Sequence, residues 1–408
     1  MLALPFLVMV VASRGLTAPF PAALTADESA SHYPTILRFA AEWPRVDLTR
    51  YHSVTTPLFH LLMAGLARLV GGDLFKLRLA NALIAYLAVL AFHRLLRVHF
   101  APSAGSALLQ ALVLALIPYG FANSFVLMTD PLAWLLWFGA MHLTLRLAAR
   151  PRALDQALLP LCFGAAVLTR QSSLALAPLI LVVLASRWGW RSRRLLAVAA
   201  SLAAAALPYA ALVRRWGGSV PVEMAGAFVS SSGNPKAFAF MLCVVGLYLP
   251  FYLVGLGSGA AAQPRPARRW VPVAVATAAA AAFLIVAPMR ATAWDFGVLW
   301  RLAAAGPSWR DTSPWFWVLL PAGLYAVWLS IAGGRGLRVA PLFLLSYGLP
   351  FLISRVITQR HFETAAIVFL SLALSERAAP PPRTVGWSLA ALALVAALFD
   401  GLRYTLGV

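Results

Sequence analysis

Charged residues are scarce in this sequence, and their scarcity excludes an ordinary water-soluble protein. They make up 11% of the 408 residues, whereas hydrophobic residues make up 62%, and the mean hydropathy is +0.81. A typical soluble domain carries about 25% charged residues. A chain this apolar cannot cover a surface that faces water, but it can cover a surface that faces lipid. We therefore predict an integral membrane protein.

Cysteine and acidic residues are also few. The two cysteines, Cys162 and Cys243, each lie inside an apolar run, which argues against a disulfide framework or a zinc site. We predict no metal and no other cofactor. Only 13 acidic residues stand against 33 basic ones, for a net charge of +20. Because the basic residues fall mostly in short gaps between apolar runs, they indicate loops beside anionic lipid head groups and not a nucleic-acid-binding surface.

Long apolar runs predict an all-α, polytopic transmembrane bundle of about 11–13 spans, since a spanning helix needs roughly 20 mostly apolar residues. We expect 1–408 to form a single integral membrane domain, with a first outside loop over 21–75, a helical module over 76–213 and a second over 214–408. The candidate spans are 2–20, 76–96, 104–122, 127–147, 155–169, 171–186, 195–213, 238–257, 270–289, 314–333, 339–357, 362–376 and 385–402.

The distribution of charge predicts the orientation of these spans. Arginine clusters such as 187–194 and 265–269 follow alternate spans, so the positive-inside rule places them in the cytoplasm. Most acidic residues then fall on the outside, together with some arginines, among them Arg214 and Arg301. Two interpretations remain open for this outer face. It carries out the chemistry of the protein, or its charges neutralise one another in solvated loops.

The first outside loop is the longest polar interruption. We predict a short amphipathic helix over 28–42 and an apolar helix over 58–70, opened by Pro57 and too short to span the membrane. Asp27 and Glu28 stand side by side after the first span. Adjacent residues on a helix diverge by about 100°, so we do not expect both to serve one site. Asp27 could act as a general base, or it could be the N-cap of the helix that follows.

Five short motifs follow one another along the first part of the chain. They are Asp27-Glu28 with His32-Tyr33, Thr55-Thr56-Pro57-Leu58-Phe59, Leu77-Arg78-Leu79-Ala80-Asn81, Thr129-Asp130 and Leu168-Thr169-Arg170-Gln171. Their order and spacing resemble the GT-C superfamily of membrane glycosyltransferases, which take sugars from polyprenyl-phosphate donors. Within it, the sequence is most similar to the eukaryotic α-1,2-glucosyltransferases that add the last glucose to the dolichol-linked oligosaccharide. Two further segments resemble that family more loosely, Trp300-Arg301 and Arg360-His361-Phe362.

The resemblance implies an inverting transfer of a sugar, glucose in the most similar family, from a polyprenyl-phosphate-sugar donor to an acceptor hydroxyl outside the membrane, with Asp27 as general base. The acceptor would be a glycan, a lipid or a protein. The residues that the resemblance assigns to catalysis are Asp27, Glu28 and Asp130. Those assigned to the donor phosphate are Arg170, Arg301, Arg360 and His361. Those assigned to the acceptor or the sugar are His32, Tyr33 and Gln171.

The amino-acid composition indicates what kind of organism the chain comes from. The chain holds 31 arginines against two lysines and is rich in alanine, which is typical of a GC-rich bacterial genome. We therefore expect a bacterial inner membrane protein whose active site faces the periplasm, with a donor of the undecaprenyl or decaprenyl type.

Simpler explanations exist for single residues. Asp130 could cap the helix opened by Pro131, and each arginine could extend to the interface without a ligand. Gln171 could satisfy only the backbone at a helix break. Trp294 and Trp300 could stack on sugars, but tryptophan is ordinary at membrane interfaces.

Two other classes of protein also remain open. A transporter or lipid flippase would explain a broken helix pair at Arg170-Gln171, although the polar residues gather on one side and we find no inverted repeat. The other class is a non-catalytic membrane subunit.

Overall fold

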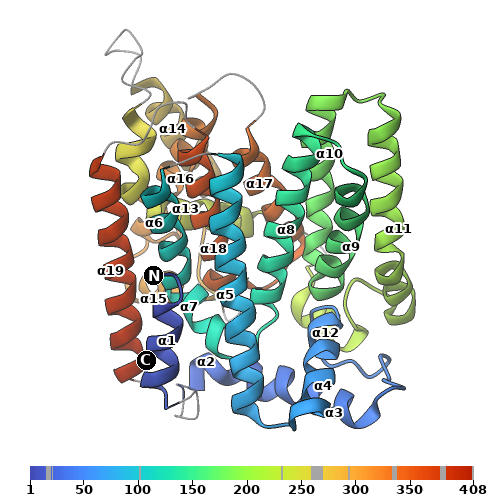
Figure 1. Cartoon of the computed structure of the whole chain (residues 1–408). Coiled ribbons are helices and arrows are strands. Elements are labelled where there is room, and N and C mark those ends of the chain that lie inside the picture. The colour runs from blue at the N-terminus through green and yellow to red at the C-terminus, as the bar shows by residue number, and fades with distance from the viewer. Residues whose placement is uncertain are drawn as a thin grey trace. The chain divides into compact units, whose positions relative to one another are not determined.

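The computed structural model is built almost entirely from helices, which confirms the all-α prediction (Figure 1). The structure describes residues 1–14, 20, 22–100, 103–230, 233–258, 270–292, 295–332, 338–376 and 383–406. The chain divides into two compact units. Unit 1 comprises Met1–His99, Gly120–Gly226 and Val395–Val408, and unit 2 comprises Phe100–Tyr119 and Ala227–Leu394.

The helices that lie in unit 1 carry the first outside loop and the spans that follow it. They are α1 (Leu4–Ala12), α2 (Ala22–Asp27), the π-helical turn η1 (Glu28–His32), α3 (Tyr33–Glu42), α4 (Leu58–Val70), α5 (Leu74–His99), α8 (Asp130–Ala149), α9 (Ala153–Thr169), the 3₁₀ turn η2 (Gln171–Ala175), α10 (Leu176–Trp188) and α11 (Arg193–Trp216). Three further helices have residues in both units, α7 (Pro118–Phe125), α12 (Val222–Phe228) and α19 (Arg383–Leu406).

Unit 2 is a second set of packed helices with one short parallel pair of strands. Its elements are α6 (Ala104–Leu116), α13 (Pro235–Ser258), α14 (Trp270–Val286), β1 (Asp295–Phe296), α15 (Val298–Ala305), α16 (Pro314–Ala332), α17 (Val339–Gly348), the 3₁₀ turn η5 (Leu349–Ile353), β2 (Ile357–Thr358) and α18 (Gln359–Ser375). In the strand pair, Asp295 faces Ile357 and Phe296 faces Thr358. The helix α13 packs against both α16 and α18.

Six helices among the described residues are long and apolar enough to cross a membrane, or up to seven if one bent pair counts as a single span. The bent pair is α6 and α7, which meet at 67° where we predicted one straight span over 104–122. Ile117 lies between them in an extended conformation, as expected for a residue that precedes a proline. Several predicted spans, 155–169 among them, are apolar helices of fewer than 18 residues.

The predicted span 2–20 is wrong as a single helix. The helix α1 ends at Ala12, so it contains nine residues, too few to cross a bilayer. Residues 15–19 of that prediction lie outside the described part of the chain.

The first outside loop folds as a cap on the ends of several helices in unit 1. The predicted helix over 58–70 is confirmed as α4, whereas the predicted helix over 28–42 begins earlier, because α2, η1 and α3 form one helical run from Ala22. Figure 1 shows α2, α3 and α4 gathered at one end of α5. Ile36, Phe39 and Phe59 of this loop are buried in one apolar cluster with Leu77. The loop is therefore a packed layer with its own core.

Candidate functional site

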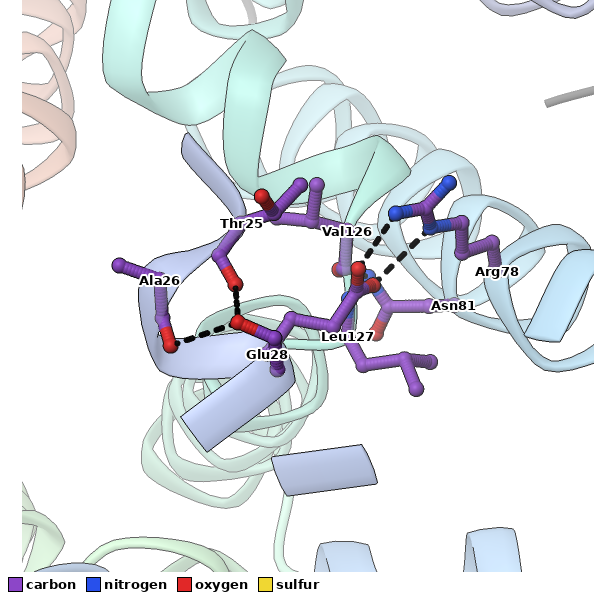
Figure 2. A network of polar contacts seen from close by, with 8 residues as sticks. Thr25, Ala26, Glu28, Arg78, Asn81, Val126 and Leu127 are labelled. Carbon is purple, nitrogen blue, oxygen red and sulfur yellow. Dashed lines mark hydrogen bonds and ion pairs between the residues drawn. The ribbon is translucent and has the colours of Figure 1, made fainter. Parts of the chain in front are cut away.

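A buried ion pair anchors the first acidic motif (Figure 2). The carboxylate of Glu28 accepts hydrogen bonds from Nε and Nη2 of Arg78, at 3.0 and 2.5 Å, and from the backbone N–H of Leu127 at 2.8 Å. Glu28 is 2% exposed and Arg78 is 7% exposed. One turn along α5, the amide of Asn81 donates to the carbonyl of Val126 at 2.7 Å. Both contacts hold the segment before α8 against α5. The ion pair of Glu28 also holds the helical run of the loop against α5.

Asp27 precedes Glu28 but has different surroundings. Its side chain is partly exposed, as expected if adjacent residues diverge around a helix. Its backbone is helical and its side chain makes no capping hydrogen bond. The helical run begins at Ala22, several residues earlier, so the N-cap explanation for Asp27 is excluded. The role of Asp27 as general base stays a prediction.

Asp130 and Arg170, which we assigned to different roles, form an ion pair with each other. Asp130 opens α8, and Arg170 has an extended backbone between α9 and η2. At the opposite ends of the same two helices, Arg146 pairs with Asp155 at 3.2 Å. The antiparallel helices α8 and α9 are therefore clamped at both ends. The acidic side chain at the start of α8 binds Arg170, whereas a helix cap would bind backbone N–H groups.

Gln171 and the Thr-Thr-Pro segment hold each other in place. The amide of Gln171 donates to the carbonyl of Val54 at 2.6 Å, and the hydroxyl of Thr56 donates to the carbonyl of Val167 at 2.6 Å. Gln171 therefore donates a hydrogen bond to a backbone carbonyl. That carbonyl belongs to a distant segment and not to the helix break where Gln171 lies. These two bonds bring together motifs that lie more than a hundred residues apart in sequence.

The two remaining loop candidates are also held by named partners. Nδ1 of His32 lies 2.9 Å from Nε2 of His60, and Nδ1 of His60 lies 2.8 Å from the hydroxyl oxygen of Tyr51. Tyr33 donates to the carbonyl of Gly72 at 2.8 Å. Burial lowers the pKa of His60 well below its ordinary value, and the charges of His32 and Arg38 lower it further. We did not predict roles for His60 or Tyr51; the available signal was a histidine within the apolar helix α4.

The candidates Arg301, Arg360 and His361 belong to unit 2. Arg301 is exposed on α15, and Arg360 and His361 lie in the first turn of α18. The strands β1 and β2 join the two segments, and the N–H of Leu299 donates to Oε1 of Gln359 at 2.9 Å. The structure therefore brings the start of α15 beside the start of α18.

The two tryptophans considered for stacking on sugars, Trp294 and Trp300, offer no support for that role. Trp300 is buried and stacks on Phe240 at 4.7 Å, so its face is occupied by the protein core. Trp294 lies outside the described residues.

Unit 2 also contains a buried carboxylate that sequence reasoning missed. Glu363 on α18 is fully buried and accepts hydrogen bonds from the N–H of Tyr119 at 2.7 Å and the hydroxyl of Tyr248 at 2.5 Å. It lies four residues after Gln359, which supports α15. Burying a carboxylate costs free energy unless it is paired or hydrogen-bonded, so Glu363 is a candidate functional residue. The signal in the sequence is an acidic residue at the start of the apolar run 362–376, which also ends on Glu376.

Helices of membrane-spanning length and composition define the class as a helical integral membrane protein. Residues 54–213 match a family described as dolichyl-phosphate-mannose-protein mannosyltransferase. This range, which is less than half of the chain, includes Asp130, Arg170 and Gln171 and begins after Asp27. The family is one of membrane glycosyltransferases, but its description names mannose, so the resemblance to glucosyltransferases in particular is not confirmed.

One solved structure also aligns with the chain. It is titled "Crystal Structure of ArnT from Cupriavidus metallidurans in the apo state", and the alignment covers 90% of this chain and 72% of that chain at 15% identity, with a TM-score of 0.41. That score is too low to establish a shared fold. The chain matches no curated protein.

Proposed function

We propose that this chain is a membrane glycosyltransferase of the GT-C type, which moves a sugar from a polyprenyl-phosphate donor to an acceptor hydroxyl on the outer side of a bacterial inner membrane. The family match over 54–213 carries the proposal. That range contains α4, α5, α8 and α9, and it therefore includes the ion pair of Asp130 with Arg170 and also Arg78, whose partner Glu28 precedes the range. The ordered motifs of the first outside loop support the same reaction.

Asp27 is the proposed general base. The ion pair of Glu28 with Arg78 anchors the helix one residue later, and this holds Asp27 at the partly exposed edge of the loop layer. Asp27 takes the proton of the acceptor hydroxyl as the hydroxyl oxygen attacks the anomeric carbon. The bond from that carbon to the phosphate oxygen breaks, and the polyprenyl phosphate leaves with the electron pair. Attack opposite the leaving group inverts the anomeric centre.

The geometry of Glu28 favours a holding role over proton transfer. Three donors already bind its two oxygens, so both are engaged in contacts that hold the protein together. We therefore propose that Glu28 and Arg78 act as a pair that fixes the position of Asp27.

Arg170 is the proposed partner of the donor phosphate in unit 1. A guanidinium carries five N–H donors in a planar fork, and Asp130 engages the fork through Nη1. The ion pair with Asp130 orients the fork and leaves further donors for phosphate oxygens. For Arg301, Arg360 and His361 in unit 2 the same phosphate-binding role remains proposed. The matched family suggests that the transferred sugar is mannose, whereas the resemblance of the motifs suggests glucose.

A transporter is less well supported than this enzyme. The helix interruption at Arg170-Gln171 was the feature that suggested a transporter. It separates two helices, α9 and α10, which both pack against α8 and α11. Arg170 there is paired with Asp130 at the helix ends, and discontinuous transporter helices instead expose their ends at the bilayer midplane.

Transfer of radiolabelled sugar tests the proposal. Membranes containing the native chain, Asp27→Asn or Asp47→Asn are given polyprenyl-phosphate mannose, glucose or arabinose with lipid, glycan and peptide acceptors. Asp47 is a matched control, since it is a solvent-exposed acid of the same loop. We expect transfer by the native chain and by Asp47→Asn, and a loss of at least about 100-fold with Asp27→Asn. Absence of transfer from every donor by the folded native protein would refute the proposal.

A further inference from the structure

A buried carboxylate on α18 joins several segments of unit 2 near the start of α15. Oε2 of Glu363 accepts the backbone N–H of Tyr119 at 2.7 Å, and Oε1 accepts the hydroxyl of Tyr248 at 2.5 Å. The amide of Gln359, one turn earlier on α18, donates to the same Oε1 at 3.4 Å. All of these residues lie in unit 2, and Glu363 has no exposed surface. The carboxylate therefore orients the side chain of Gln359 and the backbone at Tyr119.

Two of these residues reach adjacent N–H groups at the start of α15, where a helix offers no backbone partners of its own. The N–H of Val298 donates to the hydroxyl oxygen of Tyr119 at 3.2 Å, and the N–H of Leu299 donates to Oε1 of Gln359 at 2.9 Å. Because the amide nitrogen of Gln359 faces Glu363, its oxygen faces α15. Glu363 therefore holds the start of α15 through two arms, Tyr119 and Gln359.

The backbone approaches closely at this junction of α15 with α18. Gly297, directly before α15, has a φ of +130°, a conformation that favours glycine. A Cβ atom at Gly297 would lie 2.5 Å from Cβ of Gln359, so a larger residue would push the two helix starts apart. The strands β1 and β2 pair just before the same two helices. Backbone and side-chain contacts therefore fix the junction together.

The short helix α15 depends on its surroundings for its position. It contains eight residues, and helices of fewer than about 12 residues are marginal by themselves. Trp300 is buried against Phe240 and Phe316, whereas Arg301, the next residue, is exposed. The N–H of Arg301 donates to the carbonyl of Gly297 at 3.0 Å. Arg301 therefore lies one turn beyond the junction, and its position is set by the junction.

We propose that Glu363, Gln359 and Tyr119 are positioning residues, which hold α15 so that the guanidinium of Arg301 is placed in advance for an anionic oxygen of the lipid-phosphate donor. This inference rests on the proposed function. A guanidinium held in advance loses less conformational entropy when it binds, so the affinity for the donor depends on the junction as well as on the charge of Arg301. Gln359 and Glu363 flank the motif Arg360-His361-Phe362 and do not belong to it.

Amide hydrogen exchange of the full-length protein in lipid nanodiscs tests the junction without any substrate. Tyr119→Phe and Gln359→Met each remove one acceptor, and we expect the double variant to raise exchange at the start of α15 at least about 10-fold. Tyr252→Phe is the matched control, because its buried hydroxyl lies 3.2 Å from the hydroxyl of Ser371 on the same helix α18, outside the junction. Unchanged exchange in the double variant would overturn the inference.

The kinetics of sugar transfer test the link to Arg301. We expect the folded double variant to lower kcat/KM for the donor about 10-fold and to leave KM for the acceptor unchanged, whereas Tyr252→Phe should keep native values. In a protein that already carries Arg301→Gln, the same two substitutions should cause little further loss, because they act through Arg301. A junction with a purely structural role would cause the same loss in both backgrounds. That result, or native donor kinetics in the double variant, would overturn the inference.

Further variants keep the test decisive. If the double variant does not fold, Gln359→Met alone should give smaller changes in the same direction in both measurements. Glu363→Gln places a donor where one oxygen accepts, so it should also raise exchange at the start of α15. A native protein that transfers no sugar would refute the proposed function and, with it, the role of Arg301 toward the donor. The exchange measurement distinguishes that failure from a failure of the junction itself.

Discussion

The guanidinium of Arg78 binds both carboxylate oxygens of Glu28, a residue 50 positions earlier in the sequence. The same carboxylate also accepts the N–H of Leu127 at 2.8 Å. Three chain segments therefore meet at one buried charge. Because Asp27 directly precedes Glu28, the position of the proposed base depends on this contact.

Removal of one partner of this pair should be strongly destabilising. Arg78→Met leaves the Glu28 carboxylate buried without its cation, and we expect a loss of about 3–5 kcal/mol in the free energy of unfolding. The double variant Glu28→Leu with Arg78→Met should recover much of that loss, because it leaves no unpaired charge. Thermal unfolding in detergent measures both. A double variant no more stable than Arg78→Met would contradict this account.

The contact between Asp130 and Arg170 should appear as energetic coupling. Asp130→Asn, Arg170→Gln and the double variant form a cycle, and we expect a coupling energy of about 0.5–3 kcal/mol in stability. In the transfer assay, Arg170→Lys should lose activity despite its retained charge, because lysine lacks the planar fork that binds phosphate at two points. Additive effects in the cycle, or full activity of the lysine variant, would contradict these roles.

The contact of α13 with α16 should not tolerate a side chain at Gly323. A Cβ atom there would overlap the carbonyl of Leu242, and one at Gly246 would overlap the carbonyl of Leu319. We expect Gly323→Ala to destabilise unit 2 by about 1–3 kcal/mol through overpacking. Gly105→Ala is the control, because a Cβ atom there meets nothing within 4 Å. Equal melting temperatures for the two variants would argue against this close helix contact.

Acid should destabilise the first outside loop through His60. Burial lowers the pKa of this histidine well below 6.5, so the unfolded chain binds a proton that the folded chain does not. Stability is therefore complete above about pH 6.5 and falls as the pH drops below it. His60→Phe should weaken this dependence between pH 7 and pH 5, whereas His52→Phe should not, since His52 is exposed. Melting temperatures over that range test the sign, and a native protein that gained stability in acid would contradict it.

Elements that depend on neighbouring residues alone could be predicted from the sequence. The helix over 58–70 was predicted with its bounds, because its apolar run begins after Pro57 and ends before two glycines. The long apolar helices followed from composition in the same way. The bend at Ile117 was not predicted, although the signal was local, since Pro118 restricts the residue before it.

The partners of the polar residues could not be predicted in this way. Asp27 and Glu28 are equivalent in sequence, and only the approach of α5 makes one a buried anchor and leaves the other partly exposed. Asp130 and Arg170, 40 residues apart in sequence, were assigned separate roles from the family resemblance, and they meet only because α8 and α9 are antiparallel. His60 looked like a polar exception in an apolar helix until His32 and Tyr51 were placed beside it.

The sequence by itself determined that this protein is a bundle of helices in a membrane, because burial in lipid depends on the composition and length of each segment taken alone. It also determined which residue types are available for the chemistry of sugar transfer. Only the tertiary structure decided which charges neutralise one another and which side chains remain accessible. The physical reason is that the environment of a charge depends on the groups within a few ångströms, and these come from distant parts of the chain.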